Sequence, residues 1–540
     1  MISTSSSSAN AQSPGLKTYF KTPEGRYKLH YEKTHPSSLL HYAYGKTVTQ
    51  VTLAHLKEKP APSTPTASSS SFSASAGVKS AAVRWLGTGN GSRALSFVGG
   101  NGGIKNVGST SRIGGSLGAS SSSNSLTNTN FDGKGTYIIS NVGDAIFISD
   151  LNSQDKDPIK SIHFSNSNPV CHAFDQDAKE GHDLLIGLNS GDVYSVSLRQ
   201  QLQDVGKKLV GALHYNKDGY VNSSRCTNIT WVPGGDGAFV VAHADGNIYV
   251  YEKNKDAAGD TTFSVIKDQT QFSVSHARYS KSNPIARWHV CQGSINSIAF
   301  SFDGAYLATV GRDGYLRVFD YSKEQLVCGG KSYYGAVLCC AWSTDGKYIL
   351  TGGEDDLVQV WSMEDRKIVA WGEGHNSWVS GVAFDSYWSA PNTDGTRETV
   401  MYRFGSVGQD TQLLLWDLEM DEIVVPLRRF AGGSPTYSTG NQSSHWDNAS
   451  PLGTLQPASS IRDVPKISPL VAHRIHNEPL SGMIFTHDSV LTVCQEGHIK
   501  IWMRPGAAES QSSNTETLLS TSSKDKPLLS SKIGGSSYKQ

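Results

Sequence analysis

The residue types that could carry chemistry gather at one place in this sequence. Three consecutive acidic residues, Glu354, Asp355 and Asp356, lie between the strand-forming runs YILTGG and LVQVWS. Neighbouring carboxylates can hold a divalent cation or act as a general acid and base. They also suit the tight turn of a β-hairpin, because Asp side chains hydrogen-bond the backbone of the turn. The elements on either side decide between these two roles.

Those elements belong to an internal repeat. INSIAFSFDGAYLATVGRDGYLRVFD aligns with VLCCAWSTDGKYILTGGEDDLVQVWS, and Phe300, Trp342 and Phe384 recur at intervals of 42 residues. Further copies occupy residues 170–198, 229–252, 379–418 and 480–503, and a split copy combines 47–53 with 135–150. A period of about 40–45 residues, with four short strands and a terminal Trp-Asp, is typical of the WD40 repeat. The sequence therefore predicts an all-β, seven-bladed WD40 β-propeller, closed by a strand from residues 18–31.

Low-complexity segments interrupt this pattern. Residues 1–15, about 57–132 and 504–540 are rich in Ser, Gly, Thr, Asn and Pro. They cannot bury enough apolar surface to offset the entropy of ordering, so we expect a disordered N-terminus, a disordered insertion and a disordered C-terminal tail. The propeller is expected to span 16–503, with a loop outside the ring at about 419–478.

The acidic cluster falls at the turn between the second and third strands of its repeat. Asp355 stands four residues after Thr351 and six before Trp361. The next copy keeps these offsets and adds a histidine before its first strand; its members are His375, Ser406, Asp410 and Trp416. The aspartate can accept the histidine N–H, the histidine can contact the hydroxyl, and the hydroxyl can accept the Trp N–H. We predict a buried structural hydrogen-bond tetrad.

This structural role explains the spacing without any catalysis by an Asp–His–Ser set. Glu354 and Asp356 are then expected to be solvated turn residues. Copies with another residue at the aspartate position, such as Val241 or Glu496, are expected to be held mainly by packing.

Composition argues against several classes of function. The chain has 48 basic and 48 acidic residues, which disfavours a polyanion-binding surface. No stretch approaches the roughly 20 apolar residues of a membrane span, and the N-terminus lacks the pattern of a signal peptide. The seven cysteines show no zinc or disulfide spacing. We predict a non-enzyme of the cytoplasm or nucleus, without metal, cofactor, small-molecule substrate, nucleic acid or membrane partner.

A propeller without a reaction centre usually binds other proteins. The loops that lead into the copies at 337–362 and 379–418 carry Tyr333, Tyr334 and Trp378. Large aromatic residues in loops are frequent interface hot spots, so we predict that these three bind a partner. Two alternatives remain: Trp378 packs under its own loop, or Tyr333 substitutes for the histidine of the next copy, with which it aligns.

Four segments resemble one family of WD-repeat proteins. They are LKTYFKTPEGRYKL (16–29), KSYYGAVLCCAWSTDGKYILTGGEDDLVQVWS (331–362), HNSWVSGVAFD (375–385) and YRFGSVGQDTQLLLWDL (402–418). These strings are similar to the dystrophia myotonica WD repeat-containing protein, its close WD-repeat paralogues and the fungal catabolite-repression protein CreC. The resemblance implies a regulatory subunit that binds and activates a ubiquitin-specific protease, with a second WD40 protein as a further partner.

Two other functions remain open. One is the substrate receptor of a cullin-type ubiquitin ligase, which often carries Arg two residues after the Trp-Asp pair; here Trp416-Asp417 is followed by Leu418 and Glu419. The other is a general WD40 scaffold with a different partner.

Overall fold

The computed structural model describes residues 16–34, 48–58, 134–178, 181–255, 261–388, 401–419 and 450–506. The chain divides into two units, residues 1–58 with 127–540 and residues 59–126, and every described residue belongs to the first. Of the segments predicted to be disordered, all but residues 57–58 and 504–506 lie outside the described residues.

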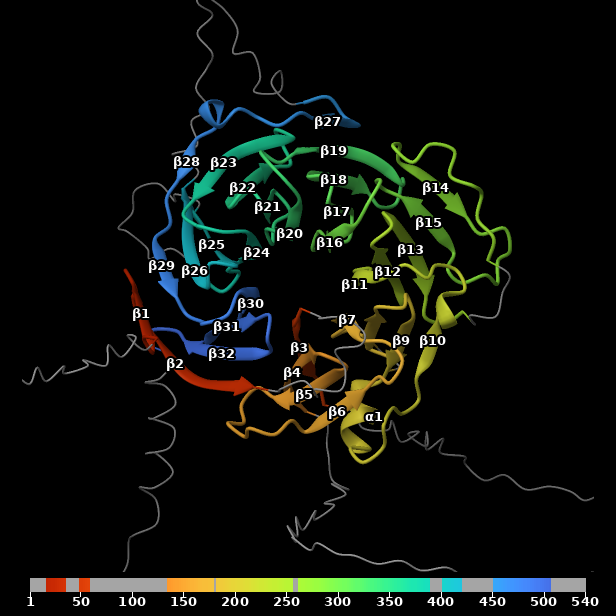
Figure 1. Ribbon diagram of the computed structural model, residues 1–540, viewed down its shortest axis with the longest axis horizontal. Helices are drawn as coiled ribbons and strands as arrows, with labels where there is room; N and C mark the ends of the chain where they lie inside the picture. The colour runs from red at the N-terminus through yellow and green to blue at the C-terminus, as the bar shows by residue number, and fades with distance from the viewer. Residues whose placement is uncertain are drawn as a thin grey trace, which may run out of the picture. The chain divides into compact units, whose positions relative to one another are not determined.

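The first unit consists of seven β-sheets, which we number as blades 1 to 7 in chain order of their innermost strands. In Figure 1 the first strand of each blade lies toward the centre of a ring, and the later strands lie farther out. The predicted seven-bladed, all-β propeller is confirmed.

The bounds of the strands follow, from the inner to the outer edge of each blade. Blade 1 contains β3 (Val51–Leu56), β4 (Gly135–Val142), β5 (Ala145–Asp150) and β6 (Lys160–His163). Blade 2 contains β7 (Pro169–Phe174), β8 (Leu184–Leu188), β9 (Val193–Val196) and β10 (Leu213–Tyr215). Blade 3 contains β11 (Cys226–Trp231), β12 (Ala238–His243), β13 (Asn247–Glu252), β15 (Ala286–His289) and β14 (Ser273–His276). Blade 4 contains β16 (Ile295–Phe300), β17 (Tyr306–Gly311), β18 (Tyr315–Asp320), β19 (Gln325–Lys331) and β27 (Thr454–Gln456).

The remaining blades carry the candidate site. Blade 5 contains β20 (Val337–Trp342), β21 (Tyr348–Gly353), β22 (Leu357–Ser362), β23 (Lys367–Glu373) and β28 (Lys466–Ile467). Blade 6 contains β24 (Val379–Phe384), β25 (Met401–Gly408), β26 (Gln412–Glu419) and β29 (Val471–Arg474). Blade 7 contains β30 (Leu480–Phe485), β31 (Ser489–Cys494), β32 (His498–Met503), β2 (Gly25–Thr34) and β1 (Tyr19–Thr22). The helices among the described residues are short: α1 (Leu198–Gln203) and the 3₁₀ turns η2 (Lys217–Gly219) and η4 (Ile461–Asp463). None of the described helices is long and apolar enough to cross a membrane.

The hydrophobic core lies between neighbouring blades. Val318 of blade 4 belongs to the same buried cluster as Trp361 and Trp371 of blade 5. Each fully buried side chain of this kind stabilises the fold by about 1.5–3 kcal/mol relative to an exposed one. Because each blade covers the apolar face of the next, strands rich in β-branched and aromatic residues can be buried on both faces.

The N-terminal hairpin closes the ring, as the sequence predicted. β2 pairs with β32 in antiparallel orientation, and β1 extends the same sheet. The rings of Phe20 and Tyr27 stack at 4.7 Å between centroids, and both side chains are buried. Phe20 also contacts Trp502 of β32, at 5.6 Å between ring centroids.

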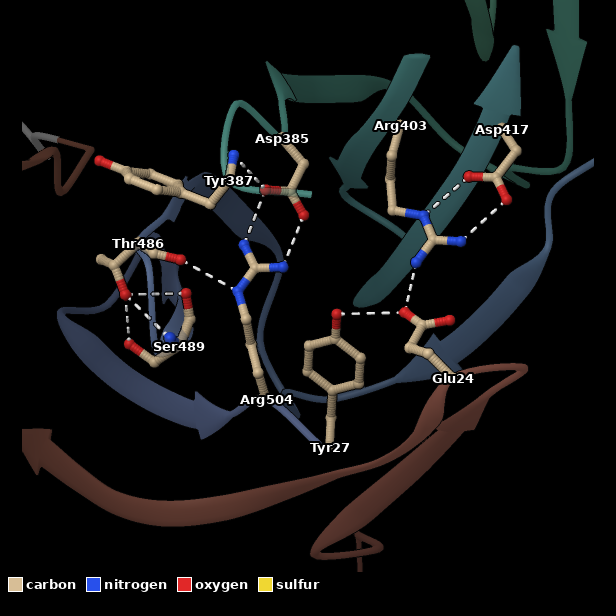
Figure 2. A network of polar contacts seen from close by, with 9 residues as sticks. All are labelled: Glu24, Tyr27, Asp385, Tyr387, Arg403, Asp417, Thr486, Ser489 and Arg504. Carbon is tan, nitrogen blue, oxygen red and sulfur yellow. Dashed lines mark hydrogen bonds and ion pairs between the residues drawn. The ribbon is translucent and has the colours of Figure 1, made fainter. Parts of the chain in front are cut away.

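A polar network fastens this hairpin to blade 6 (Figure 2). Arg403 donates to both carboxylate oxygens of Asp417, at 2.7 and 2.8 Å, and a third nitrogen of its guanidinium contacts Glu24 in the hairpin turn. Arg504 donates to both oxygens of Asp385, also at 2.7 and 2.8 Å. The ordered chain therefore extends past residue 503, the end predicted from the repeat, because Arg504 bridges blades 7 and 6.

The predicted loop at about 419–478 is wrong in part. Residues 420–449 lie outside the described residues, but the chain from residue 450 onward supplies β27, β28 and β29. β27 and β28 pair in parallel orientation with the outer strands of blades 4 and 5, and β29 completes blade 6. Strands of two to four residues give little sequence signal, because a period of two residues needs a longer run to be recognised.

Candidate functional site

Four side chains predicted to form the tetrad lie together in blade 6. Trp416 Nε1 donates to Ser406 Oγ at 2.8 Å, and Ser406 Oγ lies 2.8 Å from His375 Nε2. His375 Nδ1 lies 3.0 and 3.1 Å from the two carboxylate oxygens of Asp410. Each hydrogen has a place when the serine hydroxyl donates to Nε2 and the Nδ1–H donates to the aspartate. Ser406 is 0% exposed, so this hydroxyl has no access to a substrate.

The aspartate of this tetrad is held in its charged form. Burial alone would raise the pKa of Asp410, but a hydrogen bond from His375 and backbone N–H donors of Asn376 and Gln412 lower it below its usual value. The Asn376 N–H donates at 2.9 Å. Asp410 therefore fixes the loop before β24 as well as the histidine ring.

In blade 5 the same turn has a glutamine, in place of a histidine, between the hydroxyl and the aspartate. Trp361 Nε1 donates to Thr351 Oγ1 at 3.1 Å, and Thr351 Oγ1 donates to Gln359 Oε1 at 3.4 Å. Gln359 Nε2 then donates to Asp355 Oδ2 at 2.8 Å. The interpretation that Tyr333 substitutes for the histidine is wrong, because its side chain is exposed and Gln359 fills that place. Sequence reasoning missed the glutamine because it lies on strand β22, whereas the histidine of blade 6 lies in a loop.

The aspartate of blade 5 has a different pKa from that of blade 6. Burial raises the pKa of Asp355 to about 6, and the donors from Leu357 and Gln359 offset only part of this effect. At Asp410 the hydrogen bonds from His375, Asn376 and Gln412 outweigh the effect of burial, whereas the donors at Asp355 do not. Asp355 and Asp410 thus occupy equivalent turns with pKa values shifted in opposite directions.

Blade 7 retains three members of the tetrad. His476 Nε2 lies 3.0 Å from Thr492 Oγ1, and Trp502 Nε1 donates to the same hydroxyl at 3.1 Å. Burial lowers the pKa of His476 to about 3, so this imidazole is neutral. Glu496, at the aspartate position, is exposed, so two hydrogen bonds to Thr492 add to the packing that was expected to hold this blade.

Glu354 is not the solvated turn residue that the sequence suggested. Its Oε2 accepts the Ala336 N–H at 3.0 Å, and its own backbone N–H donates to the Ala336 carbonyl at 2.9 Å. Gly335 has φ +64°, and a Cβ there would lie 2.8 Å from Glu354 Cβ and Oε2. Glu354 therefore holds the loop before β20 through Ala336 and packs closely against Gly335.

The three predicted partner-binding residues are exposed on that loop and on the corresponding loop before β24. Tyr333 is 51% exposed, Tyr334 70% and Trp378 42%. Ser332 Oγ lies 3.3 Å from the carbonyls of Tyr334 and Gly335, and the Trp378 carbonyl accepts the Gln409 N–H at 2.9 Å. The backbone of both loops is thus fixed, while all three aromatic residues are exposed to solvent at least in part.

Both loops lie at the same end of the propeller. Neighbouring strands within each blade are antiparallel. A loop from an outer strand to the next inner strand therefore emerges beside the turn between the second and third strands. We call the surface formed by loops 332–336 and 374–378 the aromatic face.

No metal site accompanies it in the part of the chain that the structure describes: no group of three His, Cys, Asp or Glu side chains there could hold an ion. All seven cysteines are free. Burial raises the pKa of Cys340 to about 12, so this thiol is not a nucleophile at neutral pH.

Comparisons with known proteins agree with this architecture. A family model described as "WD domain, G-beta repeat" matches residues 282–320 and 326–362. WD repeat-containing protein 20 of Mus musculus is 31% identical over 482 residues, covering 65% of this chain and 83% of the relative. The UBP9-binding protein bun62 of Schizosaccharomyces pombe (strain 972 / ATCC 24843) is 31% identical over 406 residues, covering 68% of this chain and 71% of the relative.

Among solved structures, the crystal structure of the WD40 beta propeller domain of Doa1 matches with a TM-score of 0.42 and 11% identity, covering 69% of this chain and 90% of that chain. Neither relative is the dystrophia myotonica WD repeat-containing protein or CreC, which the sequence motifs resembled.

Proposed function

Because the chain belongs to the WD-repeat family that includes WD repeat-containing protein 20 and bun62, we propose that it is a non-catalytic scaffold that binds and activates a ubiquitin-specific protease. The name of bun62 states that this relative binds UBP9. That wording supports a protease of this class as the partner here. A narrower kinship with the dystrophia myotonica protein and CreC is part of the same proposal.

The observation that carries the proposal is the aromatic face. Tyr333, Tyr334 and Trp378 expose their rings from two loops of adjacent blades, and the tetrad and Glu354 fix the backbone beneath them. An aromatic residue on a fixed loop loses little conformational entropy on binding. Such residues are the ones that dominate interface energies.

Activation follows from contact away from the protease's catalytic residues. A scaffold that binds the active arrangement of the protease more tightly shifts the protease toward that arrangement by the difference in the two binding free energies. The aromatic face needs no reactive group for this role. We place the complex in the cytoplasm or nucleus, with a second WD40 protein as an additional component.

Capture from a cell extract tests the proposal. The intact chain, Trp378→Ala and Tyr334→Ala are compared, and captured proteases are identified with an electrophilic ubiquitin probe. Loss of a hot spot of about 2–4 kcal/mol should weaken binding roughly 30- to 1000-fold. Phe302→Ala is the matched control, since Phe302 is 80% exposed at the turn between β16 and β17, the opposite end of the propeller.

Each outcome has a defined meaning. Capture by the intact chain and by Phe302→Ala, but not by Trp378→Ala, supports both the function and the face. Equal capture by all variants moves the interface elsewhere. Capture of cullin-ligase components without a protease replaces the proposal with the function of a substrate receptor. If neither a protease nor cullin-ligase components are captured, the function of a general WD40 scaffold with another partner is favoured.

A further inference from the structure

One chain segment braces both aromatic loops from the outside of the propeller. Residues 450–470, which we call the strap, enter at blade 4, cross blade 5 and continue into β29 of blade 6. Figure 1 shows this segment as the blue line outside the green and teal blades, running past β27 and β28 to β29. The chain first forms three strands of blade 6. It then returns to blade 4, and the strap runs along the outside of blades 4 and 5 before β29 completes blade 6.

The strap contacts blade 4 just before the loop of Tyr333 and Tyr334. β27 pairs with Cys328–Gly330 of β19, and the Gly453 N–H donates to the Val327 carbonyl at 2.8 Å. A Cβ on Gly330 would lie 3.0 Å from Gln456 Cβ. A residue without a side chain therefore lets the strap approach, three positions before Tyr333.

The strap contacts blade 5 just before the loop of Trp378. The Trp371 N–H donates to the Pro465 carbonyl at 2.9 Å, and β28 pairs with Trp371 and Gly372. A Cβ on Gly374 would lie 3.1 Å from Pro469 Cγ. The last residues of β23, and the first of the loop that follows, thus rest against the strap.

Hydrogen bonds anchor both ends of the strap. Its start is held by Arg366 Nη1, which donates to the Ser450 carbonyl at 2.7 Å, and its end by the Leu470 N–H, which donates to the Leu415 carbonyl at 2.7 Å. Val464 is buried in the cluster between blades 4 and 5, whereas Leu452 is 66% exposed. Two short parallel pairings at a solvent-exposed edge give low local stability compared with the inner strands.

We propose that the strap is a positioning segment of the aromatic face: when docked it holds the two loops in one relative arrangement, and when undocked it releases both. Its coupling to a partner rests on the proposed function, but its coupling to the loops does not. Because such coupling is reciprocal, a partner that binds the arranged loops must also stabilise the docked strap.

Hydrogen exchange on the full chain tests the coupling without any partner. The double variant Val464→Asp and Ile467→Asp places carboxylates at two anchoring positions, and Leu452→Asp is the matched control on an exposed strap position. We expect exchange in peptides covering 331–336 and 373–378 to accelerate at least ten-fold in the double variant and to be unchanged in the control. Unchanged exchange in both loops, with rapid exchange at 453–470, overturns the proposal.

A milder variant protects the test against loss of folding. Lys466 Nζ contacts Glu373 Oε1 at 2.8 Å, and both side chains are about half exposed. Lys466→Glu places two carboxylates opposite each other at the strap's contact with β23. Exchange at 373–378 should rise two- to five-fold, with blade 1 unchanged; acceleration at 453–470 alone contradicts the coupling.

The captured protease provides the reciprocal arm. Adding it should slow exchange at 453–470, although the strap lies outside the loops that it contacts. A bound protease with no change there overturns the coupling of partner and strap. Absence of any bound protease instead defeats the proposed function, and the experiment on the free chain still decides the role of the strap.

Discussion

Gln359 Nε2 donates a 2.8 Å hydrogen bond to Asp355 Oδ2 in blade 5, at the turn equivalent to that where blade 6 sets His375 against Asp410. The two blades therefore solve the same problem with a neutral and with an ionisable donor. The difference affects the stability of the propeller in opposite ways as the pH changes.

Asp355 should destabilise the fold as the pH rises. Its pKa is about 6 in the folded chain because of burial, whereas the ordinary value is 3.8. The folded state binds this proton more tightly than the unfolded state, so stability falls between about pH 4 and pH 6. Each pH unit in this range lowers the free energy of unfolding by about 1.4 kcal/mol, so the total loss above pH 6 is about 2–3 kcal/mol.

Asp355→Asn measures this cost. Urea unfolding at pH 4 and pH 7 should show the variant gaining about 2 kcal/mol relative to the native chain at the higher pH. A difference between the two proteins that is the same at both pH values contradicts the assignment.

Asp410 should show the opposite sign. Burial opposes ionisation, but the bonds from His375, Asn376 and Gln412 lower the pKa below its ordinary value. This carboxylate therefore adds stability above the unfolded pKa, and the contribution is lost as the pH falls through the lower folded value. Asp410→Asn should cost about 1–3 kcal/mol at pH 7, and the cost should shrink toward pH 3.

The same unfolding experiment, extended to pH 3, checks this prediction. His476→Ala in blade 7 is a useful comparison, because that histidine is neutral and Glu496 stands at the aspartate position of its blade. If Asp410→Asn costs as much at pH 3 as at pH 7, the charge of Asp410 contributes nothing.

These contrasts show what the sequence could and could not predict. The 42-residue interval of Phe300, Trp342 and Phe384 predicts the fold, because these partly buried aromatic residues recur at the same position of inner strands in successive blades. The tetrad of blade 6 follows from offsets along the chain for the same reason. Gln359 could not be found by aligning it with a histidine from a loop, because the two side chains reach the same point from different elements.

The strap shows a different limit. β27 and β28 contain three and two residues, too few for a strand pattern, and they pair with strands more than 90 positions away. A Ser/Pro/Gly-rich segment therefore reads as a loop even where its backbone completes the edge of a blade. The sequence indicates these contacts only indirectly, through glycines such as Gly329, Gly330 and Gly374, at which a Cβ would lie close to the strap.

Glu354 should control the loop of Tyr333 and Tyr334. Glu354→Ala removes the acceptor of the Ala336 N–H, and we expect exchange of that amide to accelerate about ten-fold, because the lost hydrogen bond is worth roughly 1–1.5 kcal/mol. Glu354→Gln keeps an oxygen at the same reach and should restore most of the protection. The exposed Glu364→Ala, in the turn between β22 and β23 of the same blade, should leave Ala336 unchanged.

Binding gives a second reading of the same variants. Glu354→Ala should weaken capture of the protease through a faster dissociation rate, while the global unfolding free energy changes little. Protection of Ala336 in Glu354→Ala equal to that in the native chain would show that the carboxylate does not hold the loop.

The ion pair of Arg504 and Asp385 should strongly stabilise the junction between blades 7 and 6. The side chain of Asp385 is 0% exposed and that of Arg504 is 11% exposed, so Arg504→Ala leaves a carboxylate buried without its cation. Breaking such a pair from one side costs about 3–5 kcal/mol. The double variant with Asp385→Ala should recover part of that loss, because it removes the stranded charge together with its partner. A thermodynamic cycle over the two single variants and the double variant measures the coupling by urea unfolding.

Lys347→Ala is a suitable control, since its amine lies 3.8 Å from Asp345 with 68% of the side chain exposed; it should change stability by less than about 1 kcal/mol. If Arg504→Ala costs no more than this control, the ion pair does not stabilise the junction between blades 7 and 6.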